Sequence, residues 1–291
     1  MSTVTNQRDA KPVALNVKGI EIHGLSFGEE NSTKVLALHG WLDNAASFDA
    51  LAPLLENCHV VAVDLPGHGL SGHWPDFHHY HLWAGVEDIE LILDELKWSK
   101  CHLVGHSMGA AISTLYAGSF SDRLSSLTLI EAIGPMAGTL DYAPKRLKDA
   151  IQSMKSHNPE QKKKAGLQDF ISTRLNGPLK LSRAGSEKLM TRSVLQDDAG
   201  FSWRNDKRLK YTSMMRLPEP LIESFITSIR CPVLGIFAED GLFNEKSVMQ
   251  RWSKLQCDNT LSWFSGGHHL HLEGDVPAIA DHINRFIADN S

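Results

Sequence analysis

The sequence has few cysteines and no long apolar run. Only four cysteines occur among 291 residues, and Cys58, Cys101, Cys231 and Cys257 form no C-x-x-C pair. Because three of them lie beside apolar segments, we expect buried free thiols rather than disulfides or metal ligands. No apolar run is long enough to cross a bilayer, and residues 1–8 lack the apolar core of a signal peptide. We therefore expect a reduced, cytoplasmic protein without a membrane span.

An excess of positive charge is also absent. The chain has 29 Lys and Arg against 34 Asp and Glu, a net charge of -5, which argues against nucleic acid as the main partner. Hydrophobic residues make up 42% of the chain, which is enough for a sizeable core and excludes a disordered chain. The length allows one large domain or two modest ones, and the oligomeric state stays open, with a homodimer as one candidate.

The pentapeptide Gly105-His106-Ser107-Met108-Gly109 is the most informative motif of the chain. It follows the apolar residues 101–104 and precedes the helix-like residues 110–117, and this order is typical of a nucleophile elbow. The pattern predicts that Ser107 has a strained backbone and an exposed hydroxyl, above helix N–H groups that can bind a developing oxyanion. The competing interpretation is a glycine-rich turn with an incidental serine.

Strand-like segments alternate with helix-like segments over most of the chain, which predicts an α/β protein with a mostly parallel central sheet flanked by helices. We expect strands at 13–17, 20–25, 34–38, 59–63, 101–104, 124–130, 232–238 and 260–264, and helices at 47–55, 81–96, 110–117, 244–255 and 277–287. From 135 to 228 the segment has helical periodicity and no clear strand. We therefore predict a core domain of residues 1–134 and 229–291, with a helical cap of residues 135–228 inserted into it.

The sequence resembles the α/β-hydrolase superfamily over about residues 13–134 and 229–288. The resemblance rests on His39-Gly40, the run from Asp64 to Ser71 (DLPGHGLS), the pentapeptide, and Gly266-Gly267-His268. Residues 38–45 (LHGWLDNA) and 96–98 (LKW) are similar to the serine-hydrolase-like, kraken-type proteins. The resemblance implies the α/β-hydrolase fold, and it implies that the insertion is a cap over the site.

A serine nucleophile needs a general base, which is a histidine oriented by a carboxylate. In this fold the order along the chain is serine, acid, histidine, with the histidine in the last loop. His268 follows two glycines there and is the expected base, with His269 as a lesser alternative. We expect the nearby His271 to be a hydrogen-bonded or core-facing neighbour.

The acid has two candidates. Asp240 follows the strand 232–238, but the usual family spacing puts the aspartate at position 241, which is Gly241 here. Glu131 ends the strand 124–130, and residues 129–133 look like the strand end where one subgroup of haloalkane dehalogenases carries its acid. A buried carboxylate at that place would be costly without a partner such as an imidazole N–H. We predict Glu131 and keep Asp240 as the alternative.

The oxyanion hole is expected to use the backbone N–H groups of Met108, which follows the nucleophile, and of Trp41. We expect His39 to be a structural hydrogen-bonding residue. A second group of histidines has spacing that matches no familiar metal site, and we expect no metal and no cofactor. This group comprises His73, His78, His79 and His81.

These features predict a serine hydrolase that cleaves small-molecule carboxylic esters through an acyl-enzyme. The same machinery can serve thioesters, amides, lactones or carbon–carbon bonds. Dehalogenase and epoxide-hydrolase chemistry is disfavoured, because resemblance to those families implies an aspartate where this chain has Ser107. The alternative from a different functional class is a non-catalytic binding protein of the same fold. Its signature would be a missing serine, histidine or elbow glycine.

Overall fold

The computed structural model describes residues 9–76, 78–156, 163–164, 166–177 and 179–291. Residues 1–8, in which the sequence shows no apolar signal core, lie outside this set. Within the described part, Cys58, Cys101 and Cys231 are buried, Cys257 is partly exposed, and none of the four forms a disulfide. The helices of these residues include none with both the length and the apolarity needed to cross a membrane.

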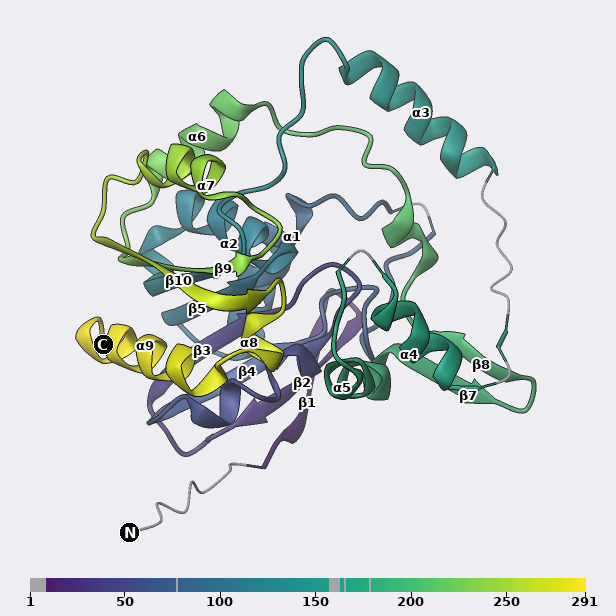
Figure 1. The fold of residues 1–291 in the computed structure, drawn as a ribbon, viewed down its shortest axis with the longest axis horizontal. Coiled ribbons are helices and arrows are strands. Elements are labelled where there is room, and N and C mark those ends of the chain that lie inside the picture. The colour runs from purple at the N-terminus through teal and green to yellow at the C-terminus, as the bar shows by residue number, and fades with distance from the viewer. Residues whose placement is uncertain (1–8, 77, 157–162, 165, 178) are drawn as a thin grey trace.

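An eight-stranded sheet in the order β1-β2-β4-β3-β5-β6-β9-β10 forms the centre of the molecule (Figure 1). Its strands are β1 (Lys11–Val17), β2 (Ile20–Phe27), β3 (Thr33–Leu38), β4 (Cys58–Val63), β5 (Cys101–His106), β6 (Leu124–Ile130), β9 (Val233–Asp240) and β10 (Asn259–Gly267). β2 is antiparallel to β1 and β4, and the other neighbours are parallel. The mostly parallel sheet predicted from the alternation is therefore confirmed.

Helices cover both faces of the sheet, and each face has its own apolar core. One core contains side chains of α1 (Ala84–Glu95), α2 (Met108–Ser119), α6 (Glu219–Ser228) and α7 (Glu245–Trp252). The other contains side chains of α8 (Leu270–Glu273) and α9 (Val276–Asp289), together with the 3-10 turns η1 (Ala45–Phe48) and η2 (Ala52–Leu54). A third 3-10 turn, η3 (Ser121–Arg123), leads into β6. This layering follows from parallel strands, which bury both faces under crossover helices.

The helix expected over residues 47–55 is wrong. The chain forms the two short turns η1 and η2 instead, and Pro53 lies inside the second of them. Proline has no backbone N–H to donate and its ring clashes with the preceding turn of an α-helix. The apolar side chains there are still buried, as expected from their spacing, because Phe48 and Leu51 pack under the sheet.

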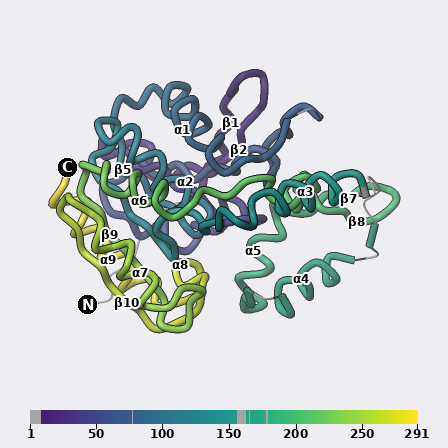
Figure 2. The backbone as a smooth tube through the Cα atoms, turned by 90° about the horizontal axis from the view of Figure 1, so that it is seen from above, coloured from purple at the N-terminus to yellow at the C-terminus, as the bar shows by residue number. Residues whose placement is uncertain are grey.

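Most of the segment between β6 and β9 lies on one side of the molecule (Figure 2). It contains α3 (Ala143–Ser156), α4 (Gln168–Leu175), α5 (Arg183–Ser193), a hairpin of β7 (Val194–Asp197) and β8 (Gly200–Trp203), and the 3-10 turn η4 (Lys207–Lys210). The sequence analysis expected no strand here, so the hairpin is a difference. Its Phe201 and Trp203 pack on a small apolar cluster that includes Phe170 of α4 and Leu189 of α5, which explains why a short hairpin is stable there.

The last helix of this segment, α6, packs against α2 rather than with α4 and α5. A Cβ atom added to Gly118 of α2 would lie 2.6 Å from the carbonyl oxygen of Phe225 in α6, so the two backbones approach closely. Ile222 and Ile226 of α6 belong to the core on that face of the sheet. The boundary of the predicted cap at residue 228 stays a prediction, and α6 itself lies in the helical layer over the sheet.

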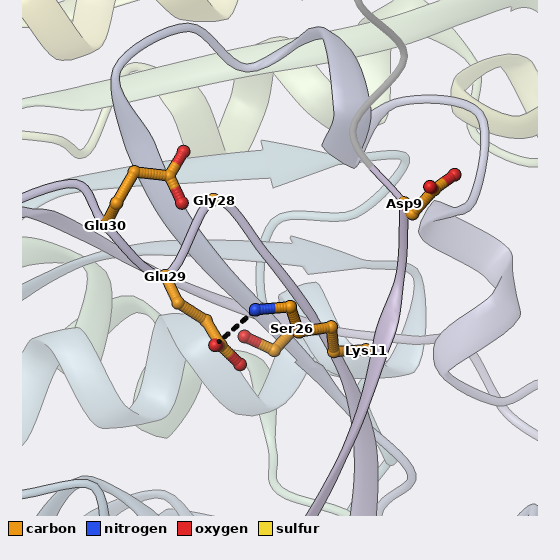
Figure 3. A pocket seen from close by; sticks show the side chains of 6 residues that line it. All are labelled: Asp9, Lys11, Ser26, Gly28, Glu29 and Glu30. Carbon is orange, nitrogen blue, oxygen red and sulfur yellow. Dashed lines mark hydrogen bonds and ion pairs between the residues drawn. The ribbon is translucent and has the colours of Figure 1, made fainter.

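A pocket at the β1 edge of the sheet is separate from the predicted serine site. It lies beside an ion pair between Lys11 Nζ and Glu29 Oε2 of 3.0 Å (Figure 3). The residues that line it are Asp9, Lys11, Ser26, Gly28, Glu29 and Glu30. None of the residues predicted for the serine site is among them, so this pocket has no part in the argument below.

A buried ion pair joins the insertion to the sheet. Arg192 of α5 donates from Nη2 to Oδ2 of Asp64 at 2.7 Å and from Nε to Oδ1 at 3.2 Å. Asp64 follows β4, is fully buried, and also accepts from the backbone N–H groups of Ala45 and Leu70. The run after β4 that the sequence analysis quoted therefore contains a carboxylate that anchors the insertion.

We expect Arg192→Ala to lower the free energy of unfolding by about 3–5 kcal/mol, because it leaves the buried Asp64 carboxylate without its cation. Denaturant unfolding followed by circular dichroism measures this effect. The matched control is Lys145→Ala, which removes an exposed ion pair with Asp149 and should leave the unfolding midpoint nearly unchanged. Equal shifts in the two variants would contradict a structural role of the buried pair.

Candidate active site

Ser107 lies at the turn between β5 and α2. Its backbone angles are φ 52° and ψ −110°, a region that residues with a side chain rarely adopt. The Ser107 N–H donates to the Ile130 carbonyl of β6 at 2.9 Å, and the Gly109 N–H donates to the His39 carbonyl at 3.1 Å. Bonds to two neighbouring strands therefore hold the turn in this conformation.

The two elbow glycines are needed for close approach, as predicted. A Cβ atom on Gly109 would lie 2.2 Å from the Leu38 carbonyl oxygen, and one on Gly105 would lie 2.7 Å from the backbone nitrogen of Ala110. Real Cβ atoms do not make such contacts with backbone. The strand, the turn and the start of α2 can pack together only if both positions are glycine.

The structure brings Ser107, His268 and Glu131 together in one hydrogen-bonded line. The Ser107 hydroxyl lies 2.9 Å from His268 Nε2, and His268 Nδ1 lies 2.9 Å from Glu131 Oε2. An ionised carboxylate can only accept, so Nδ1 carries the proton and Nε2 is free to accept from the serine. This tautomer is the one that a general base for Ser107 needs.

Glu131 is fully buried and its carboxylate accepts from three groups. Besides His268, the backbone N–H of Ala238 donates to Oε1 at 2.7 Å and that of Leu242 donates to Oε2 at 3.1 Å. Glu131 also has a positive φ of 58°, at the point where the chain leaves β6. Hydrogen bonds to a buried charge replace the water that it has lost.

Position 241 is glycine because the Glu131 carboxylate occupies the adjacent space. A Cβ atom on Gly241 would lie 2.4 Å from Oε2 and 2.5 Å from Oε1 of Glu131. Asp240, the alternative acid, is exposed at the end of β9. His268 Nδ1 is hydrogen-bonded to Glu131, so Asp240 takes no part in the hydrogen-bonded row of Ser107, His268 and Glu131.

The residues predicted for the oxyanion hole lie in two tight turns. Met108 is the first residue of α2, and Trp41 lies in a turn closed by a 3.1 Å bond from the Asp43 N–H to the Gly40 carbonyl. Within the described chain, no acceptor is bonded to the backbone N–H of Met108 or Trp41. The Trp41 indole N–H donates to the Leu209 carbonyl of the insertion at 2.9 Å, which fixes this half-exposed side chain.

The other histidines of the last loop make different contacts. His269 Nε2 lies 3.1 Å from Asp43 Oδ2, so this lesser candidate for the base is bonded away from Ser107. His271 is fully buried and lies 2.8 Å from the Ser47 hydroxyl, as expected of a hydrogen-bonded neighbour. His39 accepts from the Leu65 N–H at Nε2 and donates from Nδ1 to the Gly40 carbonyl, which are the predicted structural bonds.

The sequence analysis missed two buried polar residues that lie beneath the site, Asp43 and His106. Asp43, two positions after Trp41, forms an ion pair of 2.8 Å with Arg174 of α4. His106, the residue before Ser107, donates from Nε2 to the His268 carbonyl at 2.9 Å. Both residues stand in quoted motifs, but their partners come from distant segments. No local signal in the sequence indicates these contacts.

Burial and neighbouring charges set the ionisation of this group. Burial by itself would raise the pKa of Asp43, but the Arg174 guanidinium and His269 together hold that pKa well below its usual range. Burial, followed by the neighbouring histidines, lowers the pKa of His106 well below its usual range. Asp43 is therefore an anion and His106 a neutral imidazole at neutral pH.

Comparisons with known proteins agree with this geometry. A family model described as alpha/beta hydrolase fold matches residues 34–275. A serine hydrolase-like protein of Danio rerio is 28% identical, in an alignment that covers 100% of this chain and 92% of the relative. A probable serine hydrolase of Drosophila melanogaster is also 28% identical, over 90% of this chain and 83% of the relative.

Solved structures show the same architecture over nearly the whole chain. A hypothetical protein from Pseudomonas aeruginosa PAO1 is 35% identical with a TM-score of 0.85, and the match covers 97% of this chain and 99% of that one. The thioesterase domain from the curacin biosynthetic pathway is 24% identical with a TM-score of 0.81, over 96% and 99% of the two chains, and shows the fold alone. The resemblance inferred from the motifs is confirmed: the chain belongs to the α/β-hydrolase fold family and is a hydrolase similar to the serine hydrolase-like proteins.

Proposed function

We propose that this hydrolase cleaves carboxylic esters through an acyl-enzyme, with Ser107 as nucleophile, His268 as base and Glu131 as the orienting acid. The observation that carries the proposal is the line of two 2.9 Å contacts from the Ser107 hydroxyl through His268 to Glu131. A serine hydroxyl becomes a useful nucleophile only when a base of this kind can take its proton. The other groups at the site are then assigned by their positions.

In the first half of the reaction, the Ser107 oxygen attacks the ester carbonyl while His268 Nε2 takes the hydroxyl proton. The imidazolium that forms is stabilised by the Glu131 carboxylate, which keeps Nδ1–H in place. The negative charge on the carbonyl oxygen is stabilised by the free N–H groups of Met108 and Trp41 and by the N-terminus of α2. Collapse of this intermediate releases the alcohol, which receives its proton from Nε2.

In the second half, water hydrolyses the acyl-enzyme by the same route. His268 takes a proton from the water as the water oxygen attacks the acyl carbonyl. His268 then gives that proton to the departing Ser107 oxygen. No step requires a cofactor.

Hydrolysis of thioesters, lactones or carbon–carbon bonds by the same residues is the alternative activity. A non-catalytic binding protein is the alternative from a different functional class. The cap of residues 135–228, a cytoplasmic location and a homodimer stay predictions.

We expect Ser107→Ala to remove ester hydrolysis, with kcat falling by several orders of magnitude, as in triad knockouts of other serine hydrolases. The assay is hydrolysis of p-nitrophenyl esters over a series of acyl lengths, with circular dichroism to check the fold. Wild-type protein should be labelled at Ser107 by a fluorophosphonate, and the variant should not. A variant that keeps more than about a tenth of the wild-type kcat would rule out Ser107 as nucleophile.

We expect Glu131→Gln to lower kcat by up to about four orders of magnitude, because an amide can favour the wrong imidazole tautomer and cannot stabilise imidazolium. Asp240→Asn is the matched control, since it makes the same chemical change in the other candidate acid, and it should be mild. The measurement is kcat for one p-nitrophenyl ester in all three proteins. A larger loss in the Asp240 variant than in the Glu131 variant would reverse the assignment.

We expect Gly241→Ala to lower kcat by about 100-fold, because displacing a catalytic group such as the Glu131 carboxylate by roughly 1 Å can have an effect of this size. The new methyl carbon would lie 2.4 Å from Glu131 Oε2 and must push the carboxylate away from His268. Gly267→Ala is the control, because it lies next to His268 but a Cβ atom there meets nothing within 4 Å. Unchanged kcat in the Gly241 variant would show that the position of the Glu131 carboxylate does not matter.

A further inference from the structure

Three buried residues beneath the serine site bring their polar atoms together. Asp43, His106 and His269 are at most 3% exposed, and one ligand atom of each lies within 4.8 Å of the other two. Asp43 comes from the loop after β3, His106 from the end of β5, and His269 from the loop after β10. These are the segments that carry Trp41, Ser107 and His268, so the cluster lies where all three meet.

His106 has an unpartnered nitrogen that faces this cluster. Its Nε2 bonds the His268 carbonyl oxygen, which can only accept, so Nε2 carries the proton of the neutral ring. Nδ1 then has a lone pair, has no hydrogen-bond partner in the described residues, and lies 3.9 Å from Asp43 Oδ2. A buried lone pair and a carboxylate oxygen that face each other without a donor repel, and a cation between them would satisfy both.

We propose that Asp43, His106 and His269 bind one Zn²⁺ ion beneath the serine site. Two imidazole nitrogens and a carboxylate oxygen form a ligand set that suits zinc and its first-row neighbours. Zinc bonds of about 2.0–2.2 Å in a tetrahedron separate neighbouring ligand atoms by roughly 3.4 Å. The Asp43 Oδ2 atom lies 3.1 Å from His269 Nε2 and 3.9 Å from His106 Nδ1, and the three ligand atoms all lie within 4.8 Å of one another. The two imidazole rings must therefore move closer together to complete the tetrahedron, which leaves one position for water.

The surrounding contacts fit the ion as well. A histidine that ligates a metal usually donates its other N–H to a carbonyl or carboxylate, and His106 donates to the His268 carbonyl. Asp43 pairs with Arg174 through Oδ1 at 2.8 Å and keeps Oδ2 for the metal. The ion replaces the proton between His269 Nε2 and Asp43, and that proton passes to Nδ1 of the same ring through solvent. Nδ1 has no partner in the described residues in either tautomer.

The expected consequence is structural. One ion would link the loop after β3, the strand before the elbow and the loop after β10, while His268 and Ser107 remain outside the ligand set. Three ligands from well-separated segments are brought together only in the folded chain, so metal binding should stabilise the native state. The inference does not depend on the proposed ester hydrolysis, because binding is measured without a substrate.

The experiment titrates chelator-treated full-length protein with Co²⁺, a spectroscopic substitute for zinc, and then displaces it with Zn²⁺. We expect one equivalent of Co²⁺ to give a visible ligand-field band that one equivalent of Zn²⁺ removes, and Zn²⁺ to raise the thermal midpoint of unfolding. Loss of a residue that only supports a ligand costs about 10–100-fold in affinity. Asp43→Asn and His269→Gln should therefore each weaken binding by at least about 100-fold.

Two controls locate the bound ion. His268→Gln changes a neighbour but keeps the backbone carbonyl that holds His106, and should retain the band. His79→Gln combined with His81→Gln removes histidines of the 73–81 segment and should also retain it. The proposal is overturned if wild-type protein binds no Co²⁺, if the Asp43 and His269 variants bind it as tightly as wild type, or if a correctly folded control loses the band. Because those two variants are independent, misfolding of one still leaves a decisive comparison.

Discussion

The burial of the Glu131 carboxylate is the constraint on which the candidate site depends. A fully buried anion is stable only when its oxygens are satisfied, and here three donors reach it from β9, the loop after β9 and the loop after β10. The same contacts orient His268 toward Ser107 and require glycine at position 241. The tautomer of His268 and the glycine at position 241 therefore both follow from where the Glu131 carboxylate is buried.

Backbone strain is present at the same place. Six described residues other than glycine have a positive φ angle, and Lys18, Asn57 and Lys97 lie in turns away from the site. The other three are Leu42, Ser107 and Glu131, with φ angles of 61°, 52° and 58°. They follow β3, β5 and β6, which are consecutive neighbours in the sheet. Such conformations persist only where the surroundings over-determine them, and the paired strands, the elbow glycines and the buried polar contacts do so here. The parallel sheet thus provides the rigidity that a strained nucleophile needs.

The insertion is attached to the loops that form the site. Arg174 of α4 pairs with Asp43 after β3, and Arg192 of α5 pairs with Asp64 after β4. Both carboxylates are buried, so both pairs are costly to break. The Trp41 indole adds a third connection through the Leu209 carbonyl. Changes in the insertion are therefore coupled to the turn that carries a proposed oxyanion donor.

The sequence by itself determined the features that depend on neighbours along the chain. Strand, turn and helix around Ser107 are local, and so is the need for Gly105, whose close contact is with Ala110. The close contact that requires Gly109 is with Leu38 at the end of the neighbouring strand β3, so it depends on how the sheet is assembled. Alternating segments were enough to predict the mostly parallel sheet, whereas Pro53 within an apolar run was overlooked and a helix was expected wrongly. Only the tertiary structure decided the rest. Glu131 and His268 are 137 residues apart, and nothing local links Asp43, His106 and His269, because contacts between distant segments are set by packing of the whole sheet.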